Sequence, residues 1–473
     1  MHVAFPLFAN DDRRRELLVA CLVVVVGVAN VAWRLGTPGD WWFEDDPLLY
    51  AGVGKAASPG GFFYDVAANR LATTGPNELA PMLLSSMWLD LWLAPRSTVW
   101  AYAHSGFVYL ATSVALYFAT LRLLRERWLA LTTTIAWMLL PSTAVLVEFL
   151  STRHYLIGMF WALMAAMSVD DALNARPGPR KLILLRVATF TALSIISKEF
   201  FPPAVLTLTF LWFAWQRDWR GAAIPVVLGA LYAIYRVSMT EPSLIYYGNA
   251  LMSASQVVKL LLRLPYMTYG GWIGYAALAL TVLLLRRQVR ADRTVLPVVA
   301  IGAATMVVSL LVIYPVGNPV ANAWSSFGTW YRTPFVINTL LLLAFAYAIR
   351  NLRQTPAKVA LMTVLLIGVL HGSHRTAEQW DRMKAQQVAE AQFIFENPDK
   401  TLVSRVRAVW FLRGVAALFP ERRIGAFVCL WDRPRSKAYT ELLQSARPFW
   451  VYHNGQIRQG DFALLQRLSA ETL

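Results

Sequence analysis

Three consecutive carboxylates, Glu44, Asp45 and Asp46, follow the first long apolar segment of the chain. They stand in the stretch Trp-Trp-Phe-Glu-Asp-Asp-Pro at 41–47, whose tryptophans favour the headgroup level of a bilayer. Neighbouring acids at a membrane surface repel each other and resist desolvation, so such a cluster needs a partner or a task. One task is general-base catalysis, in which a positioned carboxylate takes a proton from an acceptor hydroxyl. The oxygens also suit a divalent cation, and an exposed acidic loop is the structural alternative.

Two charged residues also stand where one apolar run ends and the next begins. Glu148 follows the run that contains Pro141, and Arg153 opens the next run together with His154. Glu148 and Arg153 either pair with each other or help to bind a substrate, and the sequence leaves both interpretations open. The histidines His154 and His371 are too isolated in the sequence to predict metal ligands.

A lysine and an arginine at further junctions suit an anionic ligand. Lys198 and Glu199 lie between two apolar runs, where a charge is costly unless it is solvated or paired. Lys198 offers a point charge to a lipid phosphate, and Glu199 can orient it. Arg332 follows Trp330 and Tyr331 at the start of another run. The guanidinium of Arg332 either binds a phosphate or reaches into the headgroups. For Lys198 and Glu199 the alternative to phosphate binding is a short solvated turn.

The composition places these residues in a membrane protein. The chain has 473 residues, of which 57% are hydrophobic and only 15% are charged, against about a quarter in soluble domains. Apolar runs of about 20 residues, each ended by arginines, predict a polytopic helical membrane protein. The net charge of +16 resides mostly in short loops, so it indicates membrane topology and no nucleic-acid partner.

The fold class that we predict is an all-α polytopic membrane protein with about eleven transmembrane helices. Alternate loops are rich in arginine and lysine, namely 13–15, 122–127, 176–186, 217–220, 286–293 and 350–358. Such loops favour the cytoplasmic side, so the N-terminus is predicted there and all of the candidate residues named above on the extracytoplasmic side. The membrane domain spans 1–373, with a first outer loop at 34–97.

The composition changes after about residue 374 to that of a soluble segment. Residues 374–473 are predicted to form a small α+β domain on the extracytoplasmic side, because an odd number of spans ends there. A helix is expected over 376–395. The alternating stretch 449–453, followed by Asn454-Gly455 and then 456–459, predicts a β-hairpin with a tight turn.

In order along the chain, these motifs resemble the GT-C superfamily of multi-span glycosyltransferases that use polyprenyl-phosphate-linked sugars. The similarity is to its protein O-mannosyltransferase and tetratricopeptide-bearing transmembrane mannosyltransferase branch, over roughly residues 17–350. The matching elements are an acidic first loop, Pro…Glu…Ser-x-Arg, Ser-Lys-Glu before a proline, and Tyr-Arg before a late span. In this chain the acidic first loop is Glu44-Asp45-Asp46, and the second pattern is Pro141, Glu148, Ser151 and Arg153. The third is Ser197-Lys198-Glu199 with Pro202 or Pro203, and the fourth is Tyr331-Arg332.

The resemblance implies a mechanism. Lys198 and Arg332, with Arg153, would hold the donor phosphate, and Asp45 or Asp46 would deprotonate an acceptor hydroxyl on a glycan, lipid or protein. Attack on the far face of the anomeric carbon would invert it. The chain departs from the family in having three acids in the first loop, which leaves the base ambiguous. Its tail also lacks the tetratricopeptide pattern, which puts the specificity for protein acceptors in doubt.

Other functional classes share some of these features. A flippase, ligase or polymerase of lipid-linked glycans would also need basic phosphate contacts, but a flippase should carry charges along its spans. A secondary transporter should show inverted repeats with broken helices, and none is evident in the sequence. A non-catalytic scaffold would tolerate substitution of the acid cluster. No cofactor is certain, and a divalent cation at the cluster stays open.

Overall fold

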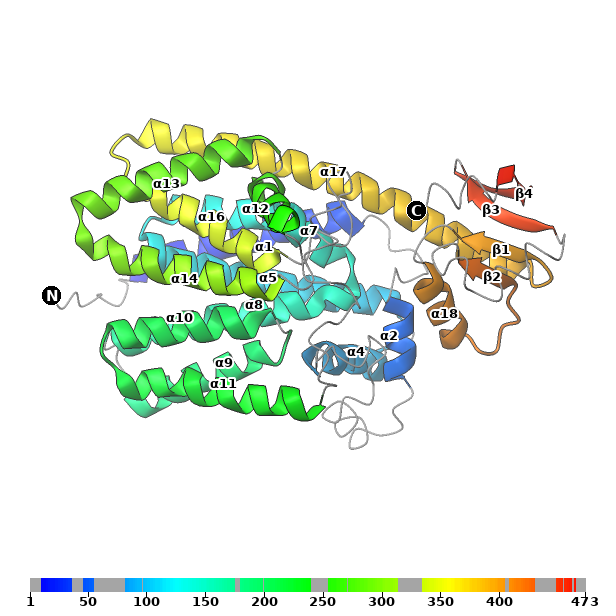
Figure 1. The fold of residues 1–473 in the computed structure, drawn as a ribbon, viewed down its shortest axis with the longest axis horizontal. Helices are drawn as coiled ribbons and strands as arrows, with labels where there is room; N and C mark the ends of the chain where they lie inside the picture. Colours follow the sequence, from blue (N-terminus) through cyan, green and yellow to red (C-terminus); the bar gives the residue numbers. More distant parts are fainter. Residues whose placement is uncertain are drawn as a thin grey trace.

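The computed structural model describes residues 10–35, 46–54, 81–95, 97–174, 179–198, 200–239, 254–269, 271–313, 334–404, 408–429, 448–453, 455–461 and 463–464. Helices make up most of this part of the chain and gather into one elongated bundle, with a small sheet beyond one end (Figure 1). The helices are α1 (Asn10–Leu35), α2 (Asp46–Val53), α4 (Pro81–Leu93), α5 (Thr98–Leu124), α6 (Arg127–Leu139), α7 (Pro141–Glu148), η1 (Leu150–Thr152), α8 (Arg153–Leu173), α9 (Arg180–Ile195), α10 (Phe201–Trp215), α11 (Trp219–Met239), α12 (Ala254–Tyr269), α13 (Ile273–Ala291), η2 (Arg293–Val295), α14 (Leu296–Ile313), α16 (Phe335–Arg350), α17 (Thr355–Glu396) and α18 (Ala408–Leu418).

The helix ends follow local sequence signals. Ser97 caps α5 by accepting a hydrogen bond from the Trp100 N–H at 3.2 Å, and α5 stops at Arg125, whose φ is 57°. The chain bends by 60° between α6 and α7. Pro141 stands at that bend, and a proline restricts the preceding residue and lacks the N–H that would continue a helix. One of the predicted spans is therefore formed by two short helices, α6 and α7.

A helix lies at each of the eleven predicted spans, but eleven membrane crossings are not confirmed. Six of the described helices are long and apolar enough to cross a membrane, or seven if the bent pair α6–α7 is one span. They cover Arg14–Leu35, Thr98–Leu124, Leu150–Leu173, Trp219–Ser238, Arg293–Leu310 and Thr355–Glu396. Helices α9, α10 and α16 have only 15 or 16 residues each, short of the 20 or so that span a hydrocarbon core.

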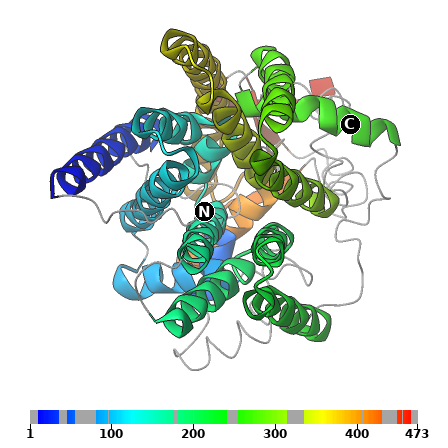
Figure 2. The same ribbon diagram turned by 90° about the vertical axis from the view of Figure 1, so that its left-hand side faces the viewer.

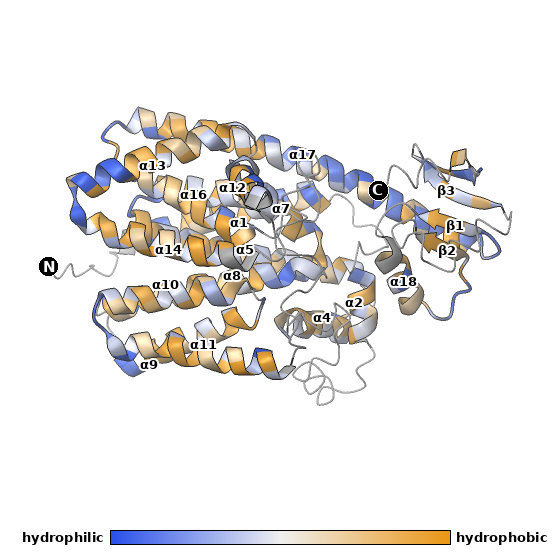
Figure 3. Ribbon diagram, viewed as in Figure 1, coloured by the Kyte–Doolittle hydropathy of each residue, from blue (hydrophilic) through white to orange (hydrophobic). Residues whose placement is uncertain are grey.

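The two ends of the bundle differ in polarity. The connections α10–α11, α13–α14 and α16–α17 lie together at the end marked by the N-terminus in Figure 1, which is also the end that faces the viewer in Figure 2. Helix ends there are hydrophilic, whereas the middle of the bundle is mostly apolar (Figure 3). Three of the six arginine-rich loops thus gather at one end, which we call the basic end. The short helices α2 and α4 lie toward the other.

The C-terminal part forms a four-stranded sheet of order β2-β1-β3-β4. Its strands are β1 (Thr401–Ser404), β2 (Ala426–Cys429), β3 (Phe449–His453) and β4 (Gln456–Gly460). β1 pairs in parallel with β2 and β3, and α18 connects β1 to β2. β3 and β4 form the predicted antiparallel hairpin, which is confirmed, with Gly455 at a φ of +83° in its turn.

The long helix α17 joins the sheet to the bundle without a break. The sequence suggests a last span followed by a separate helix over 376–395, but α17 is one helix of 42 residues that includes both. At 1.5 Å per residue it extends over about 63 Å. Trp380 on α17 packs against Phe149 with ring centroids 5.8 Å apart, so the second half of the helix still contacts the bundle.

Helix α18 packs directly against α2, the short helix that follows the acid cluster (Figure 1). The contact is close at Gly414, where an added Cβ would overlap the backbone of Pro47 and Leu48. Backbone atoms cannot turn away as a flexible side chain can, so only glycine fits without displacing one of the helices. Helix α18 is therefore seated on the helix that begins at Asp46.

Replacing Gly414 with Ala is expected to lower the stability of the protein by about 1–3 kcal/mol, because the methyl group overpacks this contact. The matched control is Gly302→Ala on α14, where an added Cβ meets no atom within 4 Å. That change is expected to raise stability slightly, by about 0.5–1 kcal/mol, through helix propensity alone. Thermal unfolding of the purified variants in detergent measures both. Equal melting temperatures for the two variants would contradict the tight seating of α18 on α2.

Candidate active site

The last acid of the first-loop cluster is anchored to the junction between α7 and α8. Asp46 is fully buried, and its carboxylate accepts hydrogen bonds from the backbone N–H groups of Leu150 at 3.1 Å and Ser151 at 2.6 Å. Those groups open the helical turn η1, where unpaired N–H groups attract an anion. The carboxylate thus ties α2 to the segment between Glu148 and Arg153, about 100 residues further along the chain.

Tyr155 brings two more of the candidate segments to the same place. Its ring lies 5.8 Å from the ring of Phe200 and 6.4 Å from that of Phe335. Phe200 comes two residues after Lys198, and Phe335 comes three residues after Arg332. The start of α8 is therefore the point around which the described flanks of all four candidate segments meet.

Four of the predicted site residues lie within the described part of the chain: Asp46, Glu148, Arg153 and Lys198. The other five lie outside it: Glu44, Asp45, Glu199, Tyr331 and Arg332. Their assignment to the site stays a prediction from the sequence. The structure shows the positions of the residues near them in the chain, such as Asp46, Phe200 and Phe335.

Glu148 is the centre of a buried charge triad. Its side chain is fully buried and lies 3.3 Å from the Arg34 guanidinium and 3.0 Å from the Lys384 ammonium. Arg34 also donates to the side chains of Asn30 and Ser373. The triad joins α1, α7 and α17. Glu148 therefore does not serve as the partner of Arg153, which was the structural alternative for these two residues.

Arg153 has its own carboxylate, which the sequence analysis did not single out. Its guanidinium is fully buried and lies 2.6 Å from Asp90 of α4. It also donates to the Ala101 carbonyl at 2.8 Å and to the Tyr50 hydroxyl at 3.3 Å. A fully buried guanidinium with this many acceptors is held in place by its surroundings, and it orients α4 and α5 around the start of α8.

The Asp90 carboxylate interacts with side chains from several helices. The Tyr50 hydroxyl donates to it at 2.6 Å, and the imidazole Nδ1 of His104 lies 2.6 Å from its other oxygen. Burial by itself raises the pKa of the Asp90 carboxyl, but the hydrogen bond with His104 and the charge of Arg153 outweigh it and lower the pKa below the ordinary value. The carboxylate is therefore ionised at neutral pH and balances the buried Arg153.

Lys198 lies in the turn between α9 and α10 and is 5% exposed. Its carbonyl accepts a hydrogen bond from the Phe201 N–H at 3.0 Å, which starts α10. The neighbouring Phe201 ring packs so closely on Gly158 of α8 that a Cβ there would overlap it. Lys198 is thus held beside the first turns of α8 by the packing of its neighbours.

The residues that the sequence analysis missed are Arg34, Asp90, His104 and Lys384. Two of them carry a recognisable signal. Asp90 is a single acid within Trp-Leu-Asp-Leu-Trp, and Arg34 closes the first apolar run, so each is a charge that burial would penalise without a partner. Lys384 has no such signal, because it stands in a polar helical stretch where a lysine is ordinary.

No group of three or more His, Cys, Asp or Glu side chains that could hold a metal ion is found among the described residues. Glu44 and Asp45 are outside that part of the chain, so the suggestion of a divalent cation at the acid cluster stays a prediction.

Comparison with known proteins gives a fold-level likeness. No protein-family profile matches the chain, and no curated protein matches it in sequence. Eight chains of solved structures match it in fold. One is the crystal structure of ArnT from Cupriavidus metallidurans bound to undecaprenyl phosphate, which is 13% identical, covers 92% of each chain and gives a TM-score of 0.42.

Proposed function

We propose that the protein is an integral-membrane glycosyltransferase of the GT-C type. It would move a sugar from a polyprenyl-phosphate donor to an acceptor hydroxyl on the extracytoplasmic face, with inversion at the anomeric carbon. One observation carries the proposal. Segments far apart in the sequence, each bearing a residue suited to this chemistry, meet around the first turns of α8, at Asp46, Tyr155 and their partners.

The end of the bundle at which they meet also supports the proposal. Asp46 and Arg153 stand at the starts of α2 and α8, away from the basic end, where cytoplasmic loops are expected. A donor with its chain in the bilayer would present its phosphate at this level. The N-terminus would then be cytoplasmic and the C-terminal domain extracytoplasmic.

We assign different roles to the three acids. Asp46 is fully buried, and each of its oxygens accepts a backbone N–H, so we assign it the positioning of the loop. Asp45 immediately precedes it and is the proposed general base, with Glu44 as its neighbour. The acceptor oxygen would attack the anomeric carbon while its proton passes to Asp45. The bond between that carbon and the phosphate oxygen would break, and polyprenyl phosphate would leave.

The cations are assigned different roles as well. Arg153 pairs with Asp90, and Arg34 and Lys384 both contact Glu148. Lys198 and Arg332 are the proposed ligands of the donor phosphate, and they would stabilise the negative charge that grows on it as it leaves. Glu199 and Tyr331 flank these two cations and would orient them.

Replacing Lys198 with Gln is expected to lower the rate of transfer by about 10²–10³-fold, the loss typical of one stabilising donor in a transition state. The matched control is Lys181→Gln, since Lys181 is exposed at the start of α9, at the opposite end of that helix from Lys198. The purified protein in nanodiscs is supplied with a polyprenyl-phosphate sugar, and the released polyprenyl phosphate is measured. Consumption of donor also separates a transferase from a flippase, which would move the lipid unchanged.

A folded Lys198→Gln protein with the activity of the Lys181→Gln control would remove Lys198 from the site. Wild-type protein that consumes none of a panel of polyprenyl-phosphate sugars would contradict the transferase itself.

A further inference from the structure

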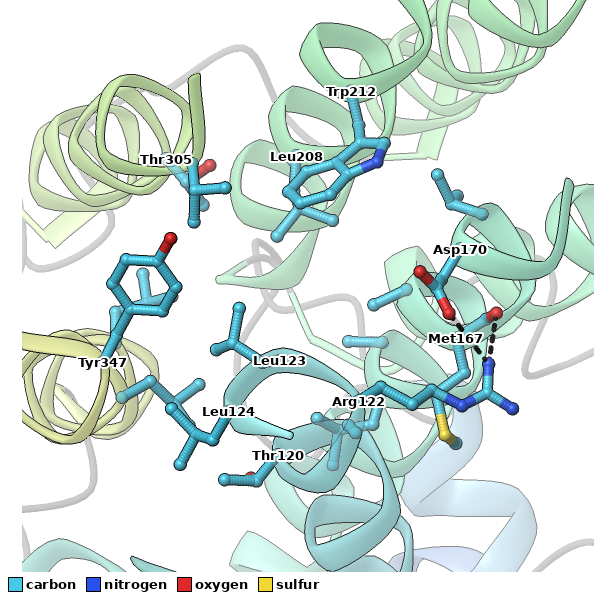
Figure 4. Close-up of a pocket in the computed structure, with 18 of the residues that line it drawn as sticks. Thr120, Arg122, Leu123, Leu124, Met167, Asp170, Leu208, Trp212, Thr305 and Tyr347 are labelled. Carbon is cyan, nitrogen blue, oxygen red and sulfur yellow. Dashed lines mark hydrogen bonds and ion pairs between the residues drawn. The ribbon is translucent and has the colours of Figure 1, made fainter. Parts of the chain in front are cut away.

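A large cavity lies inside the bundle. Its volume is about 1470 Å³, and its walls come from α5, α8, α10, α14 and α16. Figure 4 shows Leu208, Trp212, Leu123 and Tyr347 around the open space. Asp46, Glu148, Arg153 and Lys198 do not line it. The described candidate residues thus lie outside the cavity lining, although Phe201, which follows the Lys198 turn, belongs to it.

The cavity is a long slot with an apolar shaft. Along α8 its lining runs from Met159 to Asn174, which corresponds to about 22 Å at 1.5 Å per residue. Phe201 and Val336 line the deep part, whereas Gln216 and Asn351 line it where α10 and α16 end. The slot thus reaches from the interior of the bundle to the basic end.

The mouth of the slot carries an arginine, Arg350, that no carboxylate among the described residues contacts directly. Arg350 donates to the Leu123 carbonyl at 2.8 Å and to the Tyr347 hydroxyl at 3.2 Å, both neutral acceptors. Its neighbour Asp292, also in the lining, accepts the N–H and hydroxyl of Thr294 at 2.9 and 2.7 Å. Arg350 therefore brings a positive charge to the mouth.

The other charged residues of the mouth are Arg122, Arg125, Glu126, Asp170 and Asp292, and some of them form ion pairs. Arg122 lies 2.8 Å from Asp171 and 3.5 Å from Asp170, and the second of these contacts is drawn in Figure 4. Glu126 pairs with Lys358 at 2.9 Å. The guanidinium of Arg350 donates only to the neutral acceptors named above, so it can attract an additional anion although the charge of Asp292 lies nearby.

The Thr120 hydroxyl is a polar group inside the slot. The Thr120 hydroxyl lines the cavity, is 1% exposed, and makes no hydrogen bond with the described residues. A buried hydroxyl without a partner is costly, so a native structure normally supplies one. Thr120 stands two residues before Arg122, close to the mouth.

We propose that this slot binds one membrane phospholipid with an anionic headgroup. Its acyl chain would fill the apolar shaft, its ester carbonyl would accept the Thr120 hydroxyl, and its phosphate would lie against Arg350. Apolar cavities exclude water and take up apolar molecules. Basic pockets between membrane helices on the cytoplasmic side bind anionic lipid headgroups. The lipid would bridge α5, α8 and α16 to α10 and α14, independently of the proposed transferase.

The test uses the full-length protein in nanodiscs of phosphatidylglycerol and phosphatidylcholine, followed by release into detergent and native mass spectrometry. The wild type is expected to retain one phosphatidylglycerol. Ala166→Trp fills the shaft and should lower this occupancy about tenfold or more, whereas Ala230→Trp on the exposed face of α11 should leave it unchanged. If Ala166→Trp does not fold, Ala119→Phe on the opposite wall serves instead.

Arg350→Gln separates the headgroup from the chain. It should keep a bound lipid but lower the preference for phosphatidylglycerol over phosphatidylcholine about tenfold. Four results would overturn the proposal: no retained lipid, retention that Ala166→Trp leaves unchanged, equal retention of both lipids by the wild type, or binding of inorganic phosphate that fully replaces the lipid.

Discussion

Asp45→Asn is expected to lower the rate of sugar transfer by roughly 10²–10⁴-fold, the contribution typical of a general base. An amide has the shape of the carboxylate but cannot take the acceptor proton. The fold should survive, because it is the adjacent Asp46 that makes the buried hydrogen bonds to Leu150 and Ser151. The measurement is donor consumption and product formation by the purified variant with a polyprenyl-phosphate sugar, at saturating donor.

Asp46→Asn is the matched comparison, since it makes the same chemical change one residue further on. An amide offers one acceptor oxygen where the carboxylate offers two, so one of the two buried backbone N–H groups loses its partner. The expected result is a loss of about 1–3 kcal/mol in stability. Thermal unfolding should therefore separate the two variants. Asp45→Asn protein with wild-type transfer would exclude Asp45 as the base, and the same test on Glu44→Gln would follow.

The largest expected loss of stability belongs to Asp90→Leu, at about 3–5 kcal/mol. This change leaves the guanidinium of Arg153, which is fully buried, without its carboxylate at 2.6 Å. The Tyr50 hydroxyl and His104 lose the same acceptor. An uncompensated charge in a buried site costs more than the pair itself contributes, so Arg153→Met alone should also be strongly destabilising.

The double variant Asp90→Leu with Arg153→Met distinguishes this account from simple packing loss. With both charges gone, it should be more stable than the sum of the two single losses predicts, by about 1–3 kcal/mol. Denaturation of all four proteins in the same detergent gives the coupling. If the stability loss of the double variant equals the sum of the two single losses, Asp90 and Arg153 do not stabilise each other.

The sequence predicted the helices and the hairpin because local patterns determine both. Apolar runs need helical backbone in a membrane, and Asn-Gly between alternating strands determines its own turn. It also predicted that distant charged segments share one end of the bundle, since loop charge sets the direction of each span. The meeting of Asp46 with Leu150 and Ser151 agrees with that expectation.

The partners of the buried charges could not be predicted in the same way. Glu148 and Arg153 stand close in the sequence, so mutual pairing was the natural alternative. In the fold Glu148 contacts Arg34 and Lys384, more than 100 residues away on either side. Such choices depend on how helices pack in three dimensions, and a single sequence carries no local signal for them.

Helix α17 shows a further difference. A span and a polar helix, each predicted separately, form one helix although Gly372 and Ser373 stand between them, and no proline interrupts it there.

An unbroken helix of this length acts as a stiff rod. Its polar half carries the β-sheet, and in its middle Lys384 and Trp380 contact Glu148 and Phe149 beside the start of α8. A macromolecule that binds the sheet would therefore displace Glu148 and Phe149 directly, with no hinge to absorb the movement. Binding at the sheet and the geometry at the start of α8 would then be mechanically coupled.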